Sequence, residues 1–431
     1  MKRAPRRTTG RHVAALLAGV LAPSLAFATN GYFAHGYGMK AKGMAGVGIA
    51  LPQDALAAAT NPAGIAFVGD RVDLGLDWFH PSRGAEIVGN GGIPPFGIPS
   101  LNGTYSGNGK SNFFIPEFGY NRTINDKFSA GIAVFGNGGM NTQYNASPFA
   151  NLGGSNPAGV DLSQLFVAPT LAYKVTPEQS LGVSLNLAYQ RFKATGLEPF
   201  GAFGFSADPA NLTNNGYAGS TGYGLRLGWT GKFGDVFTAG ATYQSKTRMS
   251  RFDRYAGLFA DQGDFDIPAN YGVGVAARPA PGWTLAADVQ WIDYSGVPAV
   301  GNPINSLFAG QQLGSTNGPG FGWKDMTVYK FGAAWEMNPS TTLRAGVSYG
   351  SQPIPSSQTF FNILAPGTVE THLTLGGTWV LAGGNELTFA YAYMLKKTVN
   401  GSGSIPPNLG GGEANIWLSE QLLGVSYAWK F

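Results

Sequence analysis

Hydrophobic and polar positions alternate with a period of two in many segments of the chain. Between residues 181 and 190, one face of an extended segment carries only apolar residues: Leu181, Val183, Leu185, Leu187 and Tyr189. The other face carries small or polar residues, which is the pattern of a β-strand with one apolar face. Beyond residue 28 no apolar run approaches the length that a transmembrane helix needs. The pattern therefore favours strands over membrane helices.

Fourteen segments show this alternation and are predicted to be strands. They span residues 70–80, 112–122, 127–136, 164–175, 179–192, 220–231, 235–247, 268–279, 282–294, 326–337, 341–351, 369–380, 385–397 and 418–431. Short turns and long loops alternate along the series, as in outer-membrane barrels with periplasmic turns and extracellular loops. The predicted fold is an all-β, 14-stranded antiparallel transmembrane β-barrel over residues 70–431. An even number of strands places both ends of the barrel in the periplasm.

A soluble β-sandwich or propeller would also show alternation, but two features favour the barrel. Many apolar faces end in an aromatic residue, as expected for girdles at the two membrane interfaces: Trp78, Trp229, Trp283, Trp291, Trp335 and Trp379. The chain also ends on alternating apolar residues and a terminal Phe431, which resembles the signal that the barrel assembly machinery reads. We therefore predict an outer-membrane location, contacts with outer-membrane lipid and lipopolysaccharide, and recognition of Phe431 by that machinery.

Composition and charge narrow the class of protein further. Only 12% of the 431 residues are charged, 65 are glycine and none is cysteine, which excludes disulfides and thiolate metal sites. The formal net charge is +4, but residues 1–28 hold five cations and no acid, so the remainder carries 23 − 24 = −1. No nucleic-acid partner is therefore expected. A basic start, an apolar run and the small-residue site Ala26-Phe27-Ala28 predict a signal peptide over residues 1–28.

Residues 29–69 show no strand alternation and are rich in glycine and alanine. A lumen formed by fourteen strands is too wide for its own side chains to fill, so something must line, plug or flood it. A disordered periplasmic tail is the alternative, but residues such as Phe33, Met44, Ile65 and Phe67 are too apolar to remain hydrated. We therefore predict that residues 29–69 form a hatch inside the barrel.

The predicted hatch carries a set of motifs in a fixed order. These are Gly36-Tyr37-Gly38-Met39-Lys40-Ala41-Lys42-Gly43-Met44-Ala45-Gly46, Asp54-Ala55 and Asn61-Pro62-Ala63-Gly64-Ile65. In this order they resemble the N-terminal hatch of the FadL-type outer-membrane fatty acid and hydrocarbon transporters. The resemblance continues at Ile124-Asn125-Asp126-Lys127-Phe128, Trp323-Lys324-Asp325, Ser351-Gln352-Pro353-Ile354-Pro355 and Trp429-Lys430-Phe431. It implies a monomer that imports long-chain fatty acids or other hydrophobic compounds without a cofactor.

The same resemblance implies where ligands bind. In the family, long loops form a first capture groove, and the apolar loop residues here are Phe200, Phe203, Phe205, Leu258 and Phe259. These aromatics could instead only pack loop against loop. Lys324 matches the family's lysine before aspartate at a strand start, where a carboxylate-binding cation is found. Arg191 or Lys193 would supply a second cation, and which of the two is left open. Each cation could instead be solvated or pair with lipopolysaccharide phosphates.

Four residues interrupt the predicted third strand: Gly136, Asn137, Gly138 and Gly139. Glycines inside a strand weaken the ladder and mark bends, although these could also begin a loop. In the family, a kink in this strand opens a gap through which ligand leaves sideways into the membrane. The resemblance implies the same lateral release here, and it places the hatch motif Asn61-Pro62-Ala63-Gly64 beside the region that would shift. The alternative for that motif is a simple turn.

Catalytic and metal-binding patterns find little support. Gly107-Asn108-Gly109-Lys110-Ser111 lacks the earlier glycine and the strand–helix context of a phosphate-binding loop. His35, His80 and His372 have no metal-ligand spacing, so neither an enzyme nor a metal site is expected. Arg226, Lys330 and Arg344 face the lumen by parity and are expected to pair with Asp73, Asp77, Asp288 or the hatch. Three functions remain: an importer of fatty acids or of aromatic or alkane hydrocarbons, a general porin, and an adhesin or hydrolase.

Overall fold

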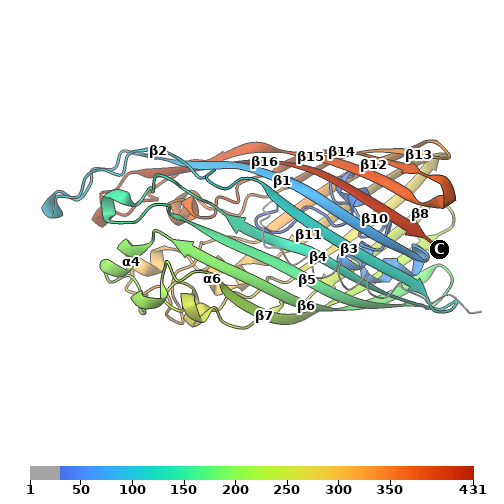
Figure 1. The fold of residues 1–431 in the computed structure, drawn as a ribbon, viewed down its shortest axis with the longest axis horizontal. Helices are drawn as coiled ribbons and strands as arrows, with labels where there is room; N and C mark the ends of the chain where they lie inside the picture. Colours follow the sequence, from blue (N-terminus) through green and yellow to red (C-terminus); the bar gives the residue numbers. More distant parts are fainter. Residues whose placement is uncertain (1–29) are drawn as a thin grey trace, which may run out of the picture.

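The computed structural model of the chain describes residues 30–431, so the predicted signal peptide lies outside the described residues. The described chain forms one closed antiparallel barrel, in which β16 (Glu413–Lys430) pairs along its whole length with β1 (Arg71–Val88) (Figure 1). The sheet has 16 strands, of which two are short: β2 (Gly103–Ser106) pairs with the loop-side half of β1, and β9 (Arg248–Met249) pairs with the loop-side half of β7 (Ala218–Phe233). The other fourteen form the wall, so the predicted 14-stranded barrel is confirmed.

The remaining wall strands follow one another around the barrel in sequence order. They are β3 (Phe113–Thr123), β4 (Phe128–Asn141), β5 (Gly159–Lys174), β6 (Gln179–Thr195), β7 (Ala218–Phe233), β8 (Phe237–Gln244), β10 (Asn270–Ala280), β11 (Trp283–Ile292), β12 (Met326–Asn338), β13 (Thr341–Gly350), β14 (Thr371–Val380) and β15 (Glu386–Val399). Several extend beyond their predicted ends on the side of the long loops; β1 reaches Val88 and β16 begins at Glu413.

The outer surface of the barrel is apolar over its middle. On β6 the side chains of Leu181, Val183, Leu185, Leu187 and Tyr189 are exposed, whereas the alternate residues face the lumen and are mostly buried. Aromatic rings gather near the short turns, where Trp283 and Trp335 stack with ring centroids 5.8 Å apart. This is the surface that a bilayer covers in an outer-membrane barrel. None of the helices within residues 30–431 has the length and apolar character needed to cross a membrane.

The two ends of the barrel differ. Short turns and the C-terminus lie at one end, and long loops with short helices such as α4 (Glu198–Ala202) and α6 (Pro298–Gly301) lie at the other (Figure 1). Further helices in these loops are α5 (Ala260–Gly263) and α7 (Asn305–Phe308). Because periplasmic turns are short and extracellular loops long, the loop end faces outward from the cell.

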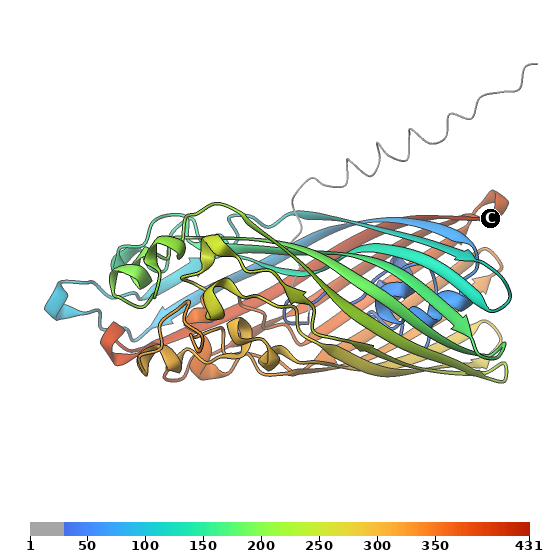
Figure 2. The ribbon, with the colours of Figure 1, turned by 90° about the horizontal axis from the view of Figure 1, so that it is seen from below.

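The segment before β1 fills the turn-side half of the lumen (Figure 2). It contains α2 (Met39–Lys42), α3 (Ala57–Thr60) and the 3-10 helix η1 (Pro62–Phe67), and nearly all of its residues are buried. Glycines on the inner wall make room for it: a Cβ added to Gly228 would lie 1.9 Å from the Asn61 Oδ1 atom. The predicted hatch is therefore confirmed as part of the fold.

Candidate functional site

A buried lysine joins the hatch to the barrel wall. The Nζ atom of Lys42 lies 2.5 Å from Asp77 Oδ2 on β1 and 2.7 Å from Glu117 Oε2 on β3, and all three side chains are buried. Burial lowers the pKa of Lys42 and the two carboxylates raise it; the net effect holds this pKa above its ordinary value. The lysine is therefore charged, and its removal would leave two carboxylates buried together.

A second ionic contact lies nearer the turns. Glu386 on β15 accepts from Lys40 of the hatch at 2.7 Å, from Arg71 at 2.9 Å and from Lys430 at 2.5 Å. Arg71 also pairs with Asp73. Hatch, first strand and last strand thus share one carboxylate, which ties the hatch to the seam where the barrel closes.

The lumen-facing cations contact the hatch, as the sequence predicts. Arg226 donates to the Thr60 carbonyl oxygen at 2.9 Å, and Lys330 donates to the His35 carbonyl oxygen at 3.0 Å. Arg344 donates to Gln53 Oε1 at 3.2 Å. These cations therefore hold the hatch in place.

Asn61 is the best-connected residue of the motif Asn61-Pro62-Ala63-Gly64. Its Nδ2 donates to the carbonyl oxygens of Ile49 and Trp229, at 2.7 and 2.9 Å, and its Oδ1 accepts from Ala63 N at 3.1 Å. The last contact caps η1, and Pro62 occupies the first turn, where its missing N–H costs nothing. The motif anchors one end of the hatch against β7.

Over one stretch the wall lacks backbone pairing between β3 and β4, and we call this unpaired stretch the opening. Their ladder runs from the pair Thr123–Ser129 to the pair Phe118–Val134 and ends there, although β3 continues to Phe113 beside β1. The β4–β5 ladder continues to Asn141 with a register shift between Gly136 and Gly138. Within the described chain, residues 113–117 of β3 thus have no strand partner on the β4 side. The predicted interruption of the third strand is a bulge, with Asn137 as the extra residue.

Hatch backbone covers the inner side of this opening. Gly139 N donates to the Tyr32 carbonyl oxygen and Ala34 N donates to the Asn137 carbonyl oxygen, both at 2.9 Å. A Cβ added to Gly138 would lie 1.8 Å from the Tyr32 oxygen, so only glycine permits this approach. The segment Tyr32–Ala34 thus pairs with β4 inside the barrel.

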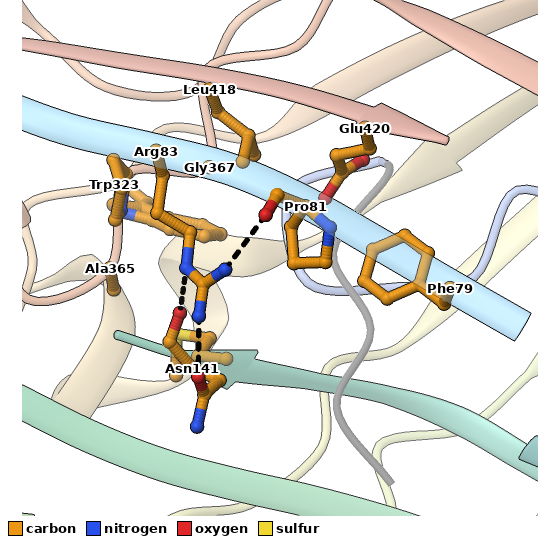
Figure 3. A pocket seen from close by; sticks show the side chains of 11 residues that line it. Phe79, Pro81, Arg83, Asn141, Trp323, Ala365, Gly367, Leu418 and Glu420 are labelled. Carbon is orange, nitrogen blue, oxygen red and sulfur yellow. Dashed lines mark hydrogen bonds between the residues drawn. The ribbon is translucent and has the colours of Figure 1, made fainter. Parts of the chain in front are cut away.

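A narrow cavity lies in the lumen above the hatch, between apolar side chains and two buried ionisable residues, Arg83 and Glu420 (Figure 3). Phe79, Met140, Trp323 and Leu418 are among its apolar lining residues. Arg83 points toward Asn141, whereas Glu420 lies beside Pro81 (Figure 3). This inner cavity borders β4 through Met140 and Asn141, immediately beyond the bulge.

Two further hollows lie toward the loops. An outer cavity, also narrow, is lined by side chains of Phe192, Leu258, Phe259 and Phe321, without a charged residue. It adjoins the inner cavity along the chain, because Phe321 and Leu364 line the outer cavity while Trp323 and Ala365 line the inner one. A wider open groove at the loops is lined by Phe205, Leu307 and Phe308.

The apolar loop residues singled out from the sequence fall at different depths. Phe205 lines the open groove, and Leu258 and Phe259 line the outer cavity. Phe200 is buried against Phe149 and Phe361, and Phe203 is partly exposed beside Phe205. The structure therefore brings three of the five to hollows, whereas Phe200 packs loop against loop.

The three cations singled out from the sequence do not line these hollows. Lys324 is exposed, although the preceding Trp323 lines the inner cavity. Arg191 and Lys193 occupy the outward-facing positions of β6 and lie over the ring of Tyr217, 4.4 and 5.2 Å from its centroid. They stand directly above the apolar band that ends at Tyr189, at the height of the lipid headgroups.

Sequence reasoning missed Arg83 and Glu420. The predicted first strand ends at residue 80, before Arg83, so the alternation assigns the Arg83 side chain to neither face of the wall. Glu420 lay inside the predicted last strand, where Leu418 and Leu422 share its face. That parity could have identified an acid in the lumen.

The closed barrel, its apolar outer surface and the hatch in its lumen define a plugged outer-membrane barrel. The chain belongs to the family described as outer membrane protein transport protein (OMPP1/FadL/TodX), whose family model matches residues 15–431. It is therefore an outer-membrane protein of a family that transports hydrophobic compounds. Among curated proteins no sequence match was found.

Solved structures of similar fold come from several bacteria. A Pseudomonas aeruginosa FadL homologue superposes with a TM-score of 0.69 at 19% identity, over 93% of this chain and 100% of that chain. The Pseudomonas putida toluene transporter TodX gives 0.66 at 21% identity, over 94% and 100%. The Ralstonia pickettii toluene transporter TbuX gives 0.61 at 19% identity, over 92% and 99%. At these identities the likeness is one of fold.

Proposed function

We propose that this protein takes up long-chain fatty acids or other hydrophobic compounds by facilitated diffusion and releases them sideways into the membrane between β3 and β4. The observation that carries the proposal is the β3–β4 ladder, which ends at Phe118 and Val134 while both strands continue. A gap at this height opens toward the bilayer, where an apolar ligand is more stable than in water.

The route begins at the loops. An apolar solute crosses the polar lipopolysaccharide layer poorly, and a wet pore would offer it no favourable surface. The open groove at Phe205, the outer cavity at Phe259 and the inner cavity at Trp323 instead form a succession of apolar surfaces. Each methylene that leaves water there gains about 0.8 kcal/mol.

Release requires the segment Tyr32–Ala34 to move, because it pairs with β4 between the inner cavity and the gap. Two hydrogen bonds and one close glycine contact hold this segment to β4. The ion pairs of Lys40 and Lys42 lie further toward the turns and can remain in place during such a movement. The moving part of the hatch is thus its first few residues.

The choice between fatty acids and hydrocarbons depends on the head group. The solved structures of toluene transporters favour neutral hydrocarbons as an alternative to fatty acids for this chain. Lys324 is exposed, so it would bind the carboxylate of a fatty acid at the rim of the barrel. Lys324→Ala is expected to weaken carboxylate binding more than binding of a neutral hydrocarbon, measured by titration of the purified protein. Equal loss for both ligands would refute the role.

The transporter and porin hypotheses predict different ion conductances for the protein. With the hatch in the lumen, the purified protein in planar bilayers is expected to show little steady ion conductance while it binds oleate or a comparable amphiphile. Large, stable open-channel currents would instead indicate a general porin. Growth of a deletion strain on a panel of fatty acids and hydrocarbons would identify the substrate.

The expected partners follow from the same placement. Lipopolysaccharide phosphates would meet Arg191 and Lys193 on the outer face, and the barrel assembly machinery would read the terminal Phe431. We expect the barrel to act as a monomer, as the resemblance to the family implies.

A further inference from the structure

The inner cavity contains a carboxyl group without a partner. Glu420 is 1% exposed, and neither of its carboxyl oxygens has a hydrogen-bond partner. Within residues 30–431 no cation lies within ion-pair distance of it. A buried polar group left in this state destabilises the protein, because it has lost its water without gaining a replacement. Such a group in a cavity wall can accept a hydrogen bond from a ligand.

The neighbouring Arg83 is already engaged elsewhere and forms neither an ion pair nor a hydrogen bond with this acid. Its Nε and Nη2 atoms donate to the Asn141 carbonyl oxygen, Asn141 Oδ1 and the Lys110 carbonyl oxygen at 2.5–2.6 Å. Its Nη1 atom donates to the Pro81 carbonyl oxygen at 3.1 Å. Four of the five N–H groups of the guanidinium are thus used to join β1 to β4 and the loop before β3. Glu420 is left as the free polar group of the cavity.

The remaining walls of the inner cavity suit an aromatic or aliphatic body. Phe79, Leu418 and Trp323 lie around the same space as Glu420 (Figure 3). A ligand whose apolar body widens this narrow space and whose hydroxyl donates one hydrogen bond would satisfy Glu420, since a carboxyl oxygen accepts a hydrogen bond whether or not the group is ionised. A hydrocarbon of the same shape would leave the acid unsatisfied, and a carboxylate would have no hydrogen to donate and would lose its own hydration in the cavity.

We infer that Glu420 is a specificity-determining residue and that the inner cavity selects neutral apolar compounds that carry a hydroxyl group, such as alkylphenols or aromatic alcohols. The inference rests on the proposed transport function and names the substrate class of its inner cavity. A site built to bond a hydroxyl rejects the analogue that lacks it more strongly than an apolar pocket rejects a missing methylene. The outer cavity, which has no charged residue, would pass all three kinds of ligand.

The test uses four ligands that share one body: 4-ethylphenol, ethylbenzene, 4-ethylanisole and 4-ethylbenzoate. Binding to the mature protein in lipid nanodiscs is measured by calorimetry, with empty nanodiscs subtracted. Wild-type protein is expected to bind 4-ethylphenol about tenfold more tightly than ethylbenzene, since leaving a buried acceptor unsatisfied costs about that factor. 4-Ethylanisole keeps the oxygen but has no O–H donor, so it is expected to bind like ethylbenzene, and 4-ethylbenzoate is expected to bind more weakly than the phenol.

Substitutions assign the preference to one residue. Glu420→Leu is expected to reduce the phenol-to-ethylbenzene ratio to about one, and Glu420→Gln to keep most of it, because the amide oxygen still accepts. Asp126→Leu removes an exposed acid at a short turn and is expected to leave the ratio unchanged.

The outcomes separate this inference from the function on which it rests. Equal wild-type affinity for 4-ethylphenol and 4-ethylanisole would overturn the inference alone, and this comparison needs no variant. A ratio that survives Glu420→Leu would overturn it as well. If wild-type protein bound oleate but none of the four ligands, the inference would fail and the proposed function would stand; if it bound neither oleate nor the four ligands, both would fail.

Discussion

The backbone of Phe33 pairs with that of Gly138 at the level where β4 has parted from β3. A residue of the hatch thus stands beside a wall strand at the point where the wall itself is open. The register shift at Asn137 and the lack of a Cβ at Gly138 both serve this contact. This contact therefore joins the hatch to the opening in the wall.

Displacing this contact should open the route from the inner cavity. Gly138→Val places a side chain where the Tyr32 carbonyl oxygen lies, so the segment Tyr32–Ala34 must leave β4. Bound ligand is expected to dissociate several-fold faster, which stopped-flow fluorescence measures. Gly219→Ala, at an outward-facing position of β7, is the control and should leave the rate unchanged. An unchanged rate in Gly138→Val would show that the segment is no barrier.

Removing the buried lysine should destabilise the protein strongly. Lys42→Met leaves Asp77 and Glu117 buried without their cation, and breaking a buried pair from one side typically costs about 3–5 kcal/mol. The free energy of unfolding can be measured by denaturant titration in detergent. Arg122→Met removes an exposed pair with Asp70 and is expected to cost less than about 1 kcal/mol. Similar losses in both variants would contradict the anchoring role of Lys42.

The outward-facing cations Arg191 and Lys193 should bind lipopolysaccharide rather than the transported ligand. Arg191→Ala combined with Lys193→Ala removes two positive charges directly above the apolar band, beside Tyr217. The double variant is expected to lose most of the thermal stabilisation that added lipopolysaccharide gives to wild-type protein, with unchanged affinity for hydrophobic ligand. A selective loss of carboxylate binding would instead restore their predicted head-group role.

The barrel could be predicted from the sequence because one physical pattern repeats in every strand. The outward residues of β6, from Leu181 to Tyr189, must be apolar to face lipid, and the alternate residues are free to be polar. Strand ends were harder to predict. Pro81 usually marks the end of a strand, yet β1 continues to Val88. It does so because β1 pairs with β3 only as far as Phe79 and with β2 only from Gly84, so Pro81 has a strand partner on one side alone.

The site could be predicted only in part. The glycines at 136, 138 and 139 indicated a bend, because a glycine-rich strand interior is unusual in any sheet. The roles of the cations could not be read in the same way, since parity shows which face a side chain takes but not what fills the space beside it. Arg191 and Lys193 have outward parity on β6. Glu420 has inward parity, but its lack of a partner depends on where Arg83 is held, which only the assembled barrel fixes.

The central claim is that ligand leaves through the wall between β3 and β4, and deletion of Asn137 tests it most directly. The deletion removes the extra residue of the bulge, so β4 can run on beside β3 and close the gap. Uptake of radiolabelled hydrophobic ligand by cells carrying the variant is compared with binding by the purified variant, with Asn137→Ser as the control that keeps the bulge. The account predicts that uptake falls tenfold or more while binding is retained. Unchanged uptake with a straightened β4 would contradict lateral release.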